Sequence, residues 1–353
     1  PIYRCYRAVI RLMEARLAEV QGQRERALAT LSLALAEAHE DHARYYLRFA
    51  DWSMAPLFCL ALERGMDVEL VRDVIRLLRL VPPPDAPDNW PWPVHIVTLG
   101  RFDVQVNGAS LAFHRKLPRK TLLLLKAIIA SGGRDVPDVA LCEALWGDDD
   151  GDAAANALSI TLVRLRKLLG TTDAVQLRAG RISLNRAMVS VDADVFERRA
   201  AGNAPAGALD LYTGTFLPDD EHEPWSVRMR ERLRGRFIDL LSGCGAVLEA
   251  RGDPASAIPH YLRGIEADPV VEAFHLGLMR CYERLGRRTE ALGAFRRMRQ
   301  TLSVGLCIPP SEASQQFYRW LLDAQSADGG VPADSATVVW FEPRTPSASQ
   351  RGR

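Results

Sequence analysis

Apolar residues recur every three to four positions through the first 80 residues, a spacing typical of amphipathic helices. Two such series lie on either side of Gly22, namely Tyr6, Ile10, Met13 and Leu17 before it and Ala27, Leu28, Leu31 and Leu35 after it. Two further helices are predicted over Ala43–Glu63 and Val68–Leu78. We therefore expect residues 1–80 to form a helical-repeat segment of the tetratricopeptide type.

A proline-rich segment ends this pattern. Residues 81–93 read VPPPDAPDNWPWP and contain six prolines. Proline lacks a backbone donor and fixes φ, so such a run cannot continue a helix. We predict an extended linker over residues 81–93, and this is the clearest domain boundary in the sequence.

Short strands and helices alternate beyond the linker. The pattern predicts strands at Val94–Leu99 and Phe102–Val106, helices at Leu117–Ala130, Asp138–Leu145 and Ala153–Leu169, and a hairpin formed by Val175–Leu177 and Ile182–Leu184. This order predicts an α+β domain over residues 94–190, with a helix-turn-helix followed by a hairpin.

The pattern is helical again over residues 191–325, and here an internal repeat occurs. Gly252, Ala257 and Tyr261 are matched 34 residues later by Gly286, Ala291 and Phe295. This is the period of a tetratricopeptide repeat. We assign Trp225, Tyr261, Phe274, Phe295, Phe317 and Trp320 to the repeat core. The fold class is therefore mainly α, with helical repeats flanking a winged helix-turn-helix domain. Residues 326–353 are rich in Gly, Ser, Pro and Arg, which predicts a disordered tail.

The predicted helix Ala153–Leu169 has two contrasting faces. At 100° per residue, a buried stripe collects Ala154, Leu158, Leu162, Leu165 and Leu169. The flanks and the opposite face carry Asn156, Ser159, Ile160, Val163, Arg164, Arg166 and Lys167. A helix in the DNA major groove needs short side chains near the bases, and Arg or Lys at base edges and phosphates.

This division suggests a role for each side chain. Ser159, Ile160 and Arg164 suit base contacts, whereas Arg166, Lys167 and Asn156 suit phosphates. Contact with a thymine methyl group would explain the apolar side chains of Ile160 and Val163 on an exposed face. From the helix alone, a merely solvated basic face explains the pattern equally well.

The following hairpin favours the DNA-binding interpretation. Arg178 and Arg181 flank its tip, and narrow minor grooves attract inserted arginine. Between Ala153 and Asn185 the only acidic residue is Asp173, against five basic residues. Because the whole chain has a net charge of +1, this positive charge is a local patch.

The remaining candidate chemistry is sparse. The six cysteines are scattered without zinc spacing, so we interpret them as reduced thiols of a cytoplasmic protein. No apolar run is long enough to span a membrane. Metal binding by Glu221-His222-Glu223, or by His39 and His42, is an alternative that lacks further ligands at suitable spacing. We expect no catalytic activity and no cofactor.

Three runs of sequence resemble known regulators. Residues Leu141–Gly170, LCEALWGDDDGDAAANALSITLVRLRKLLG, resemble the winged helix of OmpR/PhoB-type regulators, with VHIVTLGRFDVQVNG as its N-terminal sheet and VQLRAGRISLN as its wing. LYTGTFLPDDEHEPW, RERLRGRF and GRRTEALGAFRRMRQTLSVGLCIPPS resemble the bacterial transcriptional activator domain. This pair of domains is the arrangement of SARP-like activators, and it covers about Val94 to Ala324.

The resemblance implies roles for particular residues. It places Ser159, Ile160, Arg164, Arg166 and Lys167 at DNA-facing positions of the recognition helix and Arg181 in the wing. Val163 departs from the polar or basic residue that many relatives carry. The acidic loop Trp146–Asp152, including Asp148, Asp149 and Asp150, resembles the transactivation loop that meets RNA polymerase.

The resemblance also implies partners. Residues 1–93 resemble the end of the helical repeats in MalT-like regulators, so we expect the chain to be part of a longer protein. We expect a sequence-specific regulator of promoter repeats that contacts RNA polymerase and self-associates through its helical repeats. The alternative is a protein-binding scaffold with weak or no specific DNA binding.

Overall fold

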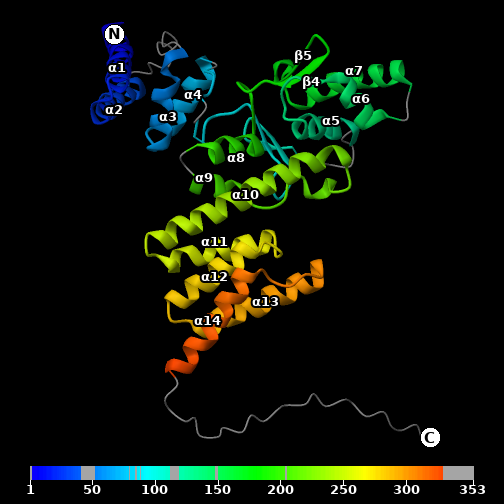
Figure 1. The fold of residues 1–353 in the computed structure, drawn as a ribbon. Coiled ribbons are helices and arrows are strands. Elements are labelled where there is room, and N and C mark those ends of the chain that lie inside the picture. The colour runs from blue at the N-terminus through cyan, green and yellow to red at the C-terminus, as the bar shows by residue number, and fades with distance from the viewer. Residues whose placement is uncertain are drawn as a thin grey trace, which may run out of the picture. The chain divides into compact units, whose positions relative to one another are not determined.

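The computed structural model describes residues 2–40, 52–78, 80–83, 86–87, 89–111, 119–147, 150–202 and 205–328. The chain forms two compact units, Pro1–Cys244 and Gly245–Arg353 (Figure 1). Helices predominate in both units, and the strands of the described residues lie in the first. This is the predicted architecture of helical repeats on either side of a winged helix. No helix of the described residues is both long and apolar enough to cross a membrane.

The N-terminal helices of the first unit are α1 (Ile2–Val20), α2 (Arg24–Glu40), α3 (Ala55–Glu63) and α4 (Val68–Leu78), with a short 3-10 turn at Trp52–Met54. Residues 41–51, on which part of the predicted helix Ala43–Glu63 falls, lie outside the described residues.

The proline-rich segment packs against these helices through Trp90, which is buried in their core. Asn89 Nδ2 donates a hydrogen bond to Leu62 O at 3.1 Å, and Arg72 Nε donates to Asn89 O at 3.0 Å. This segment, predicted to be an extended linker, is therefore held against the helical repeats at Asn89 and Trp90. The large aromatic side chain of Trp90 is the sequence feature that favours this docking, because its burial stabilises the packed segment.

Two small sheets follow. The first contains β1 (Val94–Val97), β2 (Asp103–Val106), β3 (Ala109–Ser110) and β7 (Val189–Val191) in the order β3-β2-β1-β7. β1 pairs antiparallel with β2 and parallel with β7. The sequence pattern predicted β1 and β2 and missed β3 and β7, which are too short to show a period of two.

The helix-turn-helix consists of α5 (Arg119–Ala130), α6 (Asp138–Trp146) and α7 (Gly151–Leu168). After a 3-10 turn at Thr172–Ala174, the hairpin β5 (Val175–Arg178) and β6 (Arg181–Leu184) forms the second sheet with β4 (Val136–Pro137). β4 immediately precedes α6, so the wing is joined to the start of that helix.

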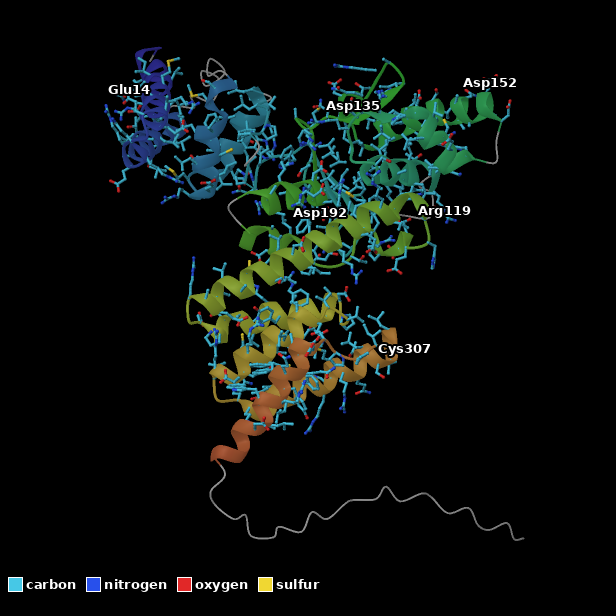
Figure 2. All side chains as sticks on the ribbon, in the orientation of Figure 1. Glu14, Arg119, Asp135, Asp152, Asp192 and Cys307 are labelled. Carbon is cyan, nitrogen blue, oxygen red and sulfur yellow. The ribbon has the colours of Figure 1, made fainter. Side chains whose placement is uncertain are left out.

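Contacts continue past the domain division predicted at residues 190 and 191. α8 (Asp192–Ala201) begins with Asp192, whose carboxylate accepts hydrogen bonds from the backbone of Thr98 and Leu99 at 2.8 to 2.9 Å. Gly100 meets Gly214 so closely that a Cβ on Gly214 would lie 2.8 Å from the Gly100 Cα. The segments after β1 and after α9 (Pro205–Leu211) therefore pack into the first unit together with the sheet, near Asp192 in Figure 2.

The first unit ends within α10 (Pro224–Ala250), which follows a 3-10 turn at Pro218–Asp220. The second unit contains α11 (Pro254–Ala267), α12 (Glu272–Arg284), α13 (Arg288–Leu306) and α14 (Glu312–Asp328). The segment predicted as helical, 191–325, is mainly helical, but α14 continues to Asp328, three residues into the predicted disordered tail 326–353.

Glycines explain how the helices of the second unit approach one another. A Cβ on Gly245 or Gly277 would lie 2.6 or 2.5 Å from the ring of Tyr261, so only glycine leaves room for this aromatic ring. Tyr261, Phe274 and Phe295 are buried as predicted. Trp320 is not a core residue, since half of its surface (50%) is exposed.

Candidate nucleic-acid interface

α7 buries the stripe that its sequence predicts. Ala154, Leu158, Leu162 and Leu165 are buried within α7, as is Leu169 directly after it. Thr161 is buried beside them and satisfies its hydroxyl by donating to Ala157 O at 2.7 Å. This stripe packs against α5 and α6, which fixes the rotation of α7 about its own axis. Figure 2 shows Asp152 at the beginning of the helix.

The opposite face of α7 is exposed to solvent. Its exposed side chains include six of the seven positions that the sequence analysis selected on this helix, namely Asn156, Ser159, Ile160, Val163, Arg164 and Lys167. Ile160 and Val163 are 45% and 64% exposed, although exposing apolar side chains is unfavourable in the isolated protein. This face combines small polar, apolar and cationic side chains over about three turns.

Arg166 differs from its neighbours on α7. Its Nε donates a hydrogen bond to Val175 O, the first residue of β5, at 2.9 Å, and the side chain is half-buried. The sequence pattern predicts a phosphate contact for Arg166. In the structure, part of its guanidinium fixes the start of the wing relative to α7. The spacing of apolar residues along α7 predicts which side chains are exposed, but it does not reveal such a bond.

The wing is a tight hairpin. Ala179 and Gly180 connect its strands with φ values of 48° and 71°, the left-handed conformation of a two-residue type I′ turn. Arg178 and Arg181 face each other directly before and after the turn, and both are exposed. The wing tip therefore presents two guanidinium groups to solvent.

Several hydrogen bonds hold this tip in place. Arg181 Nη1 donates to Asp135 O at 2.9 Å, and the Asp138 amide donates to Gly180 O at 3.0 Å. Asp138 is the first residue of α6, so the turn is tied directly to the helix-turn-helix. Asp135 and Asp138 were not selected from the sequence, because nothing in the local pattern indicates which backbone a loop will meet.

The acidic loop between α6 and α7 is described in part. Asp148 and Asp149 lie outside the described residues, whereas Trp146 is half-buried and Asp150 is exposed. Lys120 Nζ donates a hydrogen bond to Leu145 O and lies 5.3 Å from the centroid of the Trp146 ring. Lys120 thus anchors the beginning of this loop, a role that the sequence analysis missed.

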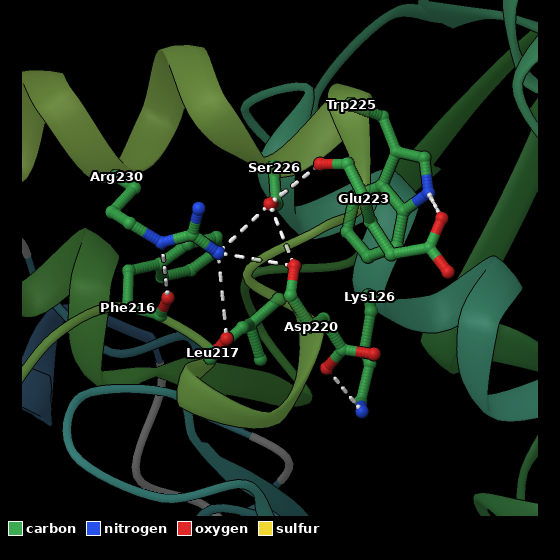
Figure 3. A network of polar contacts seen from close by, with 8 residues as sticks. All are labelled: Lys126, Phe216, Leu217, Asp220, Glu223, Trp225, Ser226 and Arg230. Carbon is green, nitrogen blue, oxygen red and sulfur yellow. Dashed lines mark hydrogen bonds and ion pairs between the residues drawn. The ribbon is translucent and has the colours of Figure 1, made fainter.

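The second acidic segment, Asp219–Glu223, contributes to the packing of the first unit. Asp220 is buried and forms an ion pair of 2.5 Å with Lys126 of α5 (Figure 3). Glu223 Oε2 accepts a hydrogen bond from Trp225 Nε1 at 3.1 Å. Asp220 is therefore a buried contact within this acidic segment.

Arg230 of α10 completes this network. Its guanidinium donates to the backbone oxygens of Phe216, Asp220, Glu221 and Leu217 at 3.1 to 3.5 Å, and to Ser226 Oγ at 2.9 Å. Figure 3 shows the side chain reaching from α10 into this turn.

No cluster of three His, Cys, Asp or Glu side chains suited to a metal occurs among the described residues. The side chains of the alternative pair, His39 and His42, lie outside the part of the chain whose side chains are described.

The chain is similar to known regulators. The family model "Bacterial transcriptional activator domain" matches residues 184–322. Regulatory protein AfsR of Streptomyces coelicolor is 28% identical over 230 residues, which make up 61% of this chain and 23% of AfsR. Regulatory protein DnrI of Streptomyces peucetius is 26% identical over 276 residues, covering 69% of this chain and 97% of DnrI. The chain thus spans less than a quarter of AfsR but nearly the whole of DnrI.

Among solved structures, Mycobacterium tuberculosis EmbR in complex with a low-affinity phosphopeptide has a TM-score of 0.53 and 20% identity. The match covers 69% of this chain and 66% of the EmbR chain, and it shows a shared fold. The match to the family model begins at Leu184, the last residue of β6, so it overlaps the end of the predicted winged-helix segment 94–190. Residues 184–322 therefore match the bacterial transcriptional activator domain, and more than half of the chain is similar to Streptomyces regulatory proteins that include AfsR and DnrI.

Proposed function

We propose that this chain binds specific promoter sequences and activates transcription, with α7 in the major groove and the wing in the adjacent minor groove. The observation that carries the proposal is the exposed face of α7. It presents apolar and cationic side chains together, whereas the opposite stripe is fully packed. A major groove about 12 Å wide accepts one α-helix, and base edges there offer both hydrogen-bond acceptors and thymine methyl groups.

Within this helix, we assign base contacts to Ser159, Ile160 and Arg164. Ile160 and Arg164 are one helical turn apart, so both reach the same side of the helix. Arg is the most frequent partner of guanine O6 and N7, and Ile160 suits a thymine methyl group. Val163 lies next to Arg164 and extends the apolar surface.

Phosphate contacts are assigned to the flanks. Lys167 and Asn156 lie near the two ends of the exposed face, and the outer nitrogens of Arg166 are proposed to contribute as well. Such contacts fix the register of the protein on DNA without reading its sequence. At the wing, Arg178 and Arg181 are proposed to enter the minor groove, whose negative potential favours arginine where the groove is narrow.

Partners beyond DNA follow the same reasoning. The loop beginning at Trp146, with Asp148, Asp149 and Asp150, is proposed to contact RNA polymerase, since its charge opposes approach to DNA. Self-association through the helical repeats would place two copies on half-sites about 34 Å apart, one turn of DNA. We propose a cytoplasmic protein that performs this function without a cofactor or catalysis.

The test is selection of bound DNA from a random pool, followed by binding of the enriched sequence at several salt concentrations. We expect a repeated motif and a steep loss of affinity with salt, because each phosphate contact releases counterions. A variant lacking two charges on α7, Arg164→Ala/Lys167→Ala, should fail to enrich that motif. The matched variant Arg228→Ala/Arg236→Ala removes two exposed charges from α10 and should still enrich it.

The competing function is a protein-binding scaffold, favoured by the helical repeats in both units. Binding that is weak, insensitive to salt and equal for both double variants would support the scaffold and reject the assignment of α7 to DNA.

A further inference from the structure

A groove lies between α13 and α14 in the second unit, with a volume of about 680 Å³. Its floor is aromatic, because the rings of Phe295 and Tyr318 stack with centroids 4.1 Å apart. Ile308 and Pro310, from the connection between the two helices, line one side. Figure 2 shows Cys307 at the end of α13, where that connection begins.

The rim of the groove is cationic. Arg299 of α13 and Arg319 of α14 line it, and none of the described residues that line it is acidic. The side of the groove is apolar as well, and Ile308 there is 48% exposed. A contiguous exposed apolar surface is typical of an interaction site. An occupant with aromatic side chains and one carboxylate would match both the floor and the rim.

The chain itself contains such a segment. Residues Val338–Pro343 read VVWFEP, so two aromatic side chains are followed directly by Glu342. The rest of residues 329–353 is dominated by Gly, Ala, Ser, Pro, Thr and Arg. This is the only place in that stretch where large apolar residues adjoin an acidic one.

The connection is long enough to bring this segment back to the groove. Tyr318 lies ten residues before Asp328, the end of α14, which corresponds to about 15 Å along a helix. The nine residues 329–337 span up to about 30 Å when extended. A chain leaving α14 can therefore reverse and reach the groove of the same molecule.

We propose that Val338–Pro343 of the same chain binds in this groove, with its aromatic side chains on the Phe295–Tyr318 floor and Glu342 at the Arg299–Arg319 rim. The segment covers the apolar surface at the end of the helical repeats.

Cys307 supplies a probe, because its exposed thiol lines the groove. Its alkylation rate is measured in the full chain by peptide-resolved mass spectrometry, which separates it from the other cysteines. With an effective concentration in the millimolar range and a segment affinity near 0.1 mM, alkylation in the wild type should be about tenfold slower than in Trp340→Ala/Phe341→Ala. The control Ser347→Ala/Ser349→Ala, in the same stretch, should keep the wild-type rate.

A charge exchange tests the rim. Glu342→Arg alone, and Arg299→Glu/Arg319→Glu alone, should both accelerate alkylation of Cys307. Combining them should restore slow alkylation, which loss of folding would not do. Equal rates in the wild type and in Trp340→Ala/Phe341→Ala would overturn the proposal. Protection that grows with protein concentration would also overturn it, since the segment of a second copy would then occupy the groove.

Discussion

Two helices of the first unit carry arginines that face very different surroundings. On α7, Arg164 is exposed, and within the described part of the chain no carboxylate or carbonyl engages it. On α10, Arg230 directs its guanidinium at four backbone oxygens and one hydroxyl. Arginine carries the same charge in both places. An arginine that keeps unengaged donors can serve a partner, whereas one whose guanidinium nitrogens all donate within the protein holds the fold.

The largest effect is expected at Arg230. Arg230→Met keeps the aliphatic stem but removes every hydrogen bond from the guanidinium, including the bond to the Phe216 carbonyl, which should lower the free energy of unfolding by about 2–4 kcal/mol. Urea unfolding measures this loss. Arg228→Met, two residues away and exposed, is the control and should change stability by less than about 0.5 kcal/mol. Equal stability of both variants would show that the network in Figure 3 contributes little.

On α7, substitutions should weaken DNA binding and leave stability almost unchanged. Arg164→Ala should weaken binding of the selected DNA by about 1–3 kcal/mol and relax sequence preference at one position. Lys167→Ala should weaken binding to all DNA sequences alike. It should also reduce the slope of log affinity against log salt concentration by about one. Titration of the selected motif and of mismatched sequences checks both outcomes, while urea unfolding should show little change. If Arg164→Ala altered stability and left DNA binding intact, the contrast between the two helices would be wrong.

Glu249 in the second unit should make the stability of the protein depend on pH. Burial alone would raise the pKa of Glu249, but hydrogen bonds from Arg280 and Tyr261 outweigh burial and lower it. The folded state therefore favours the carboxylate. Its stabilisation is present above the unfolded pKa of about 4.3 and is lost as the pH falls through the lower folded value.

Unfolding of the wild type and of Glu249→Gln between pH 3 and 7 measures this contribution. The wild type should lose its advantage over the variant, on the order of 1 kcal/mol, as the solution becomes acidic. A constant difference between the two proteins across this range would reject the role of the charge on Glu249.

Arg166 is the intermediate case, and its replacement should have modest effects on both stability and DNA binding. Arg166→Ala removes the bond to Val175 O and should destabilise the protein by about 1 kcal/mol. Because the wing then starts from a looser position, affinity for DNA should fall as well. Arg166→Lys restores the charge without the planar donor group, so it should recover general DNA affinity better than stability. Unchanged stability in both variants would show that the bond to Val175 is dispensable.

Sequence periodicity predicted the parts of the fold that depend on burial. The stripe through Leu158, Leu162 and Leu165 follows directly from a helical period of 3.6 residues, and so does the exposure of Ile160 and Val163. The long-range partners were not predictable in this way. β7 spans three residues and pairs with a strand about 95 residues earlier, so no local pattern marks it.

The same limit applies to individual polar residues. Asp220 occurs in an acidic run that indicates a solvated turn, and only the position of Lys126 makes it a buried ion pair. The helical period places Arg166 about 80° from Leu158, at the edge of the buried stripe, and Lys167 opposite that stripe, but only the approach of β5 gives Arg166 its partner. Periodicity reports which face is buried, whereas the partner of a charged group depends on the tertiary arrangement of segments far apart in the chain.

The hairpin turn at Ala179–Gly180 has a consequence for the thermodynamics of recognition. Bonds from Asp138 and Arg181 already hold the tip before any DNA arrives. A pre-ordered wing loses little conformational entropy on binding. Association should therefore lack the large negative heat-capacity change of coupled folding, and calorimetry at several temperatures should show an enthalpy that changes only gently. A rigid wing also does not have to refold at each site that it tests. The protein should therefore dissociate rapidly from incorrect sites, where the minor groove does not fit the wing.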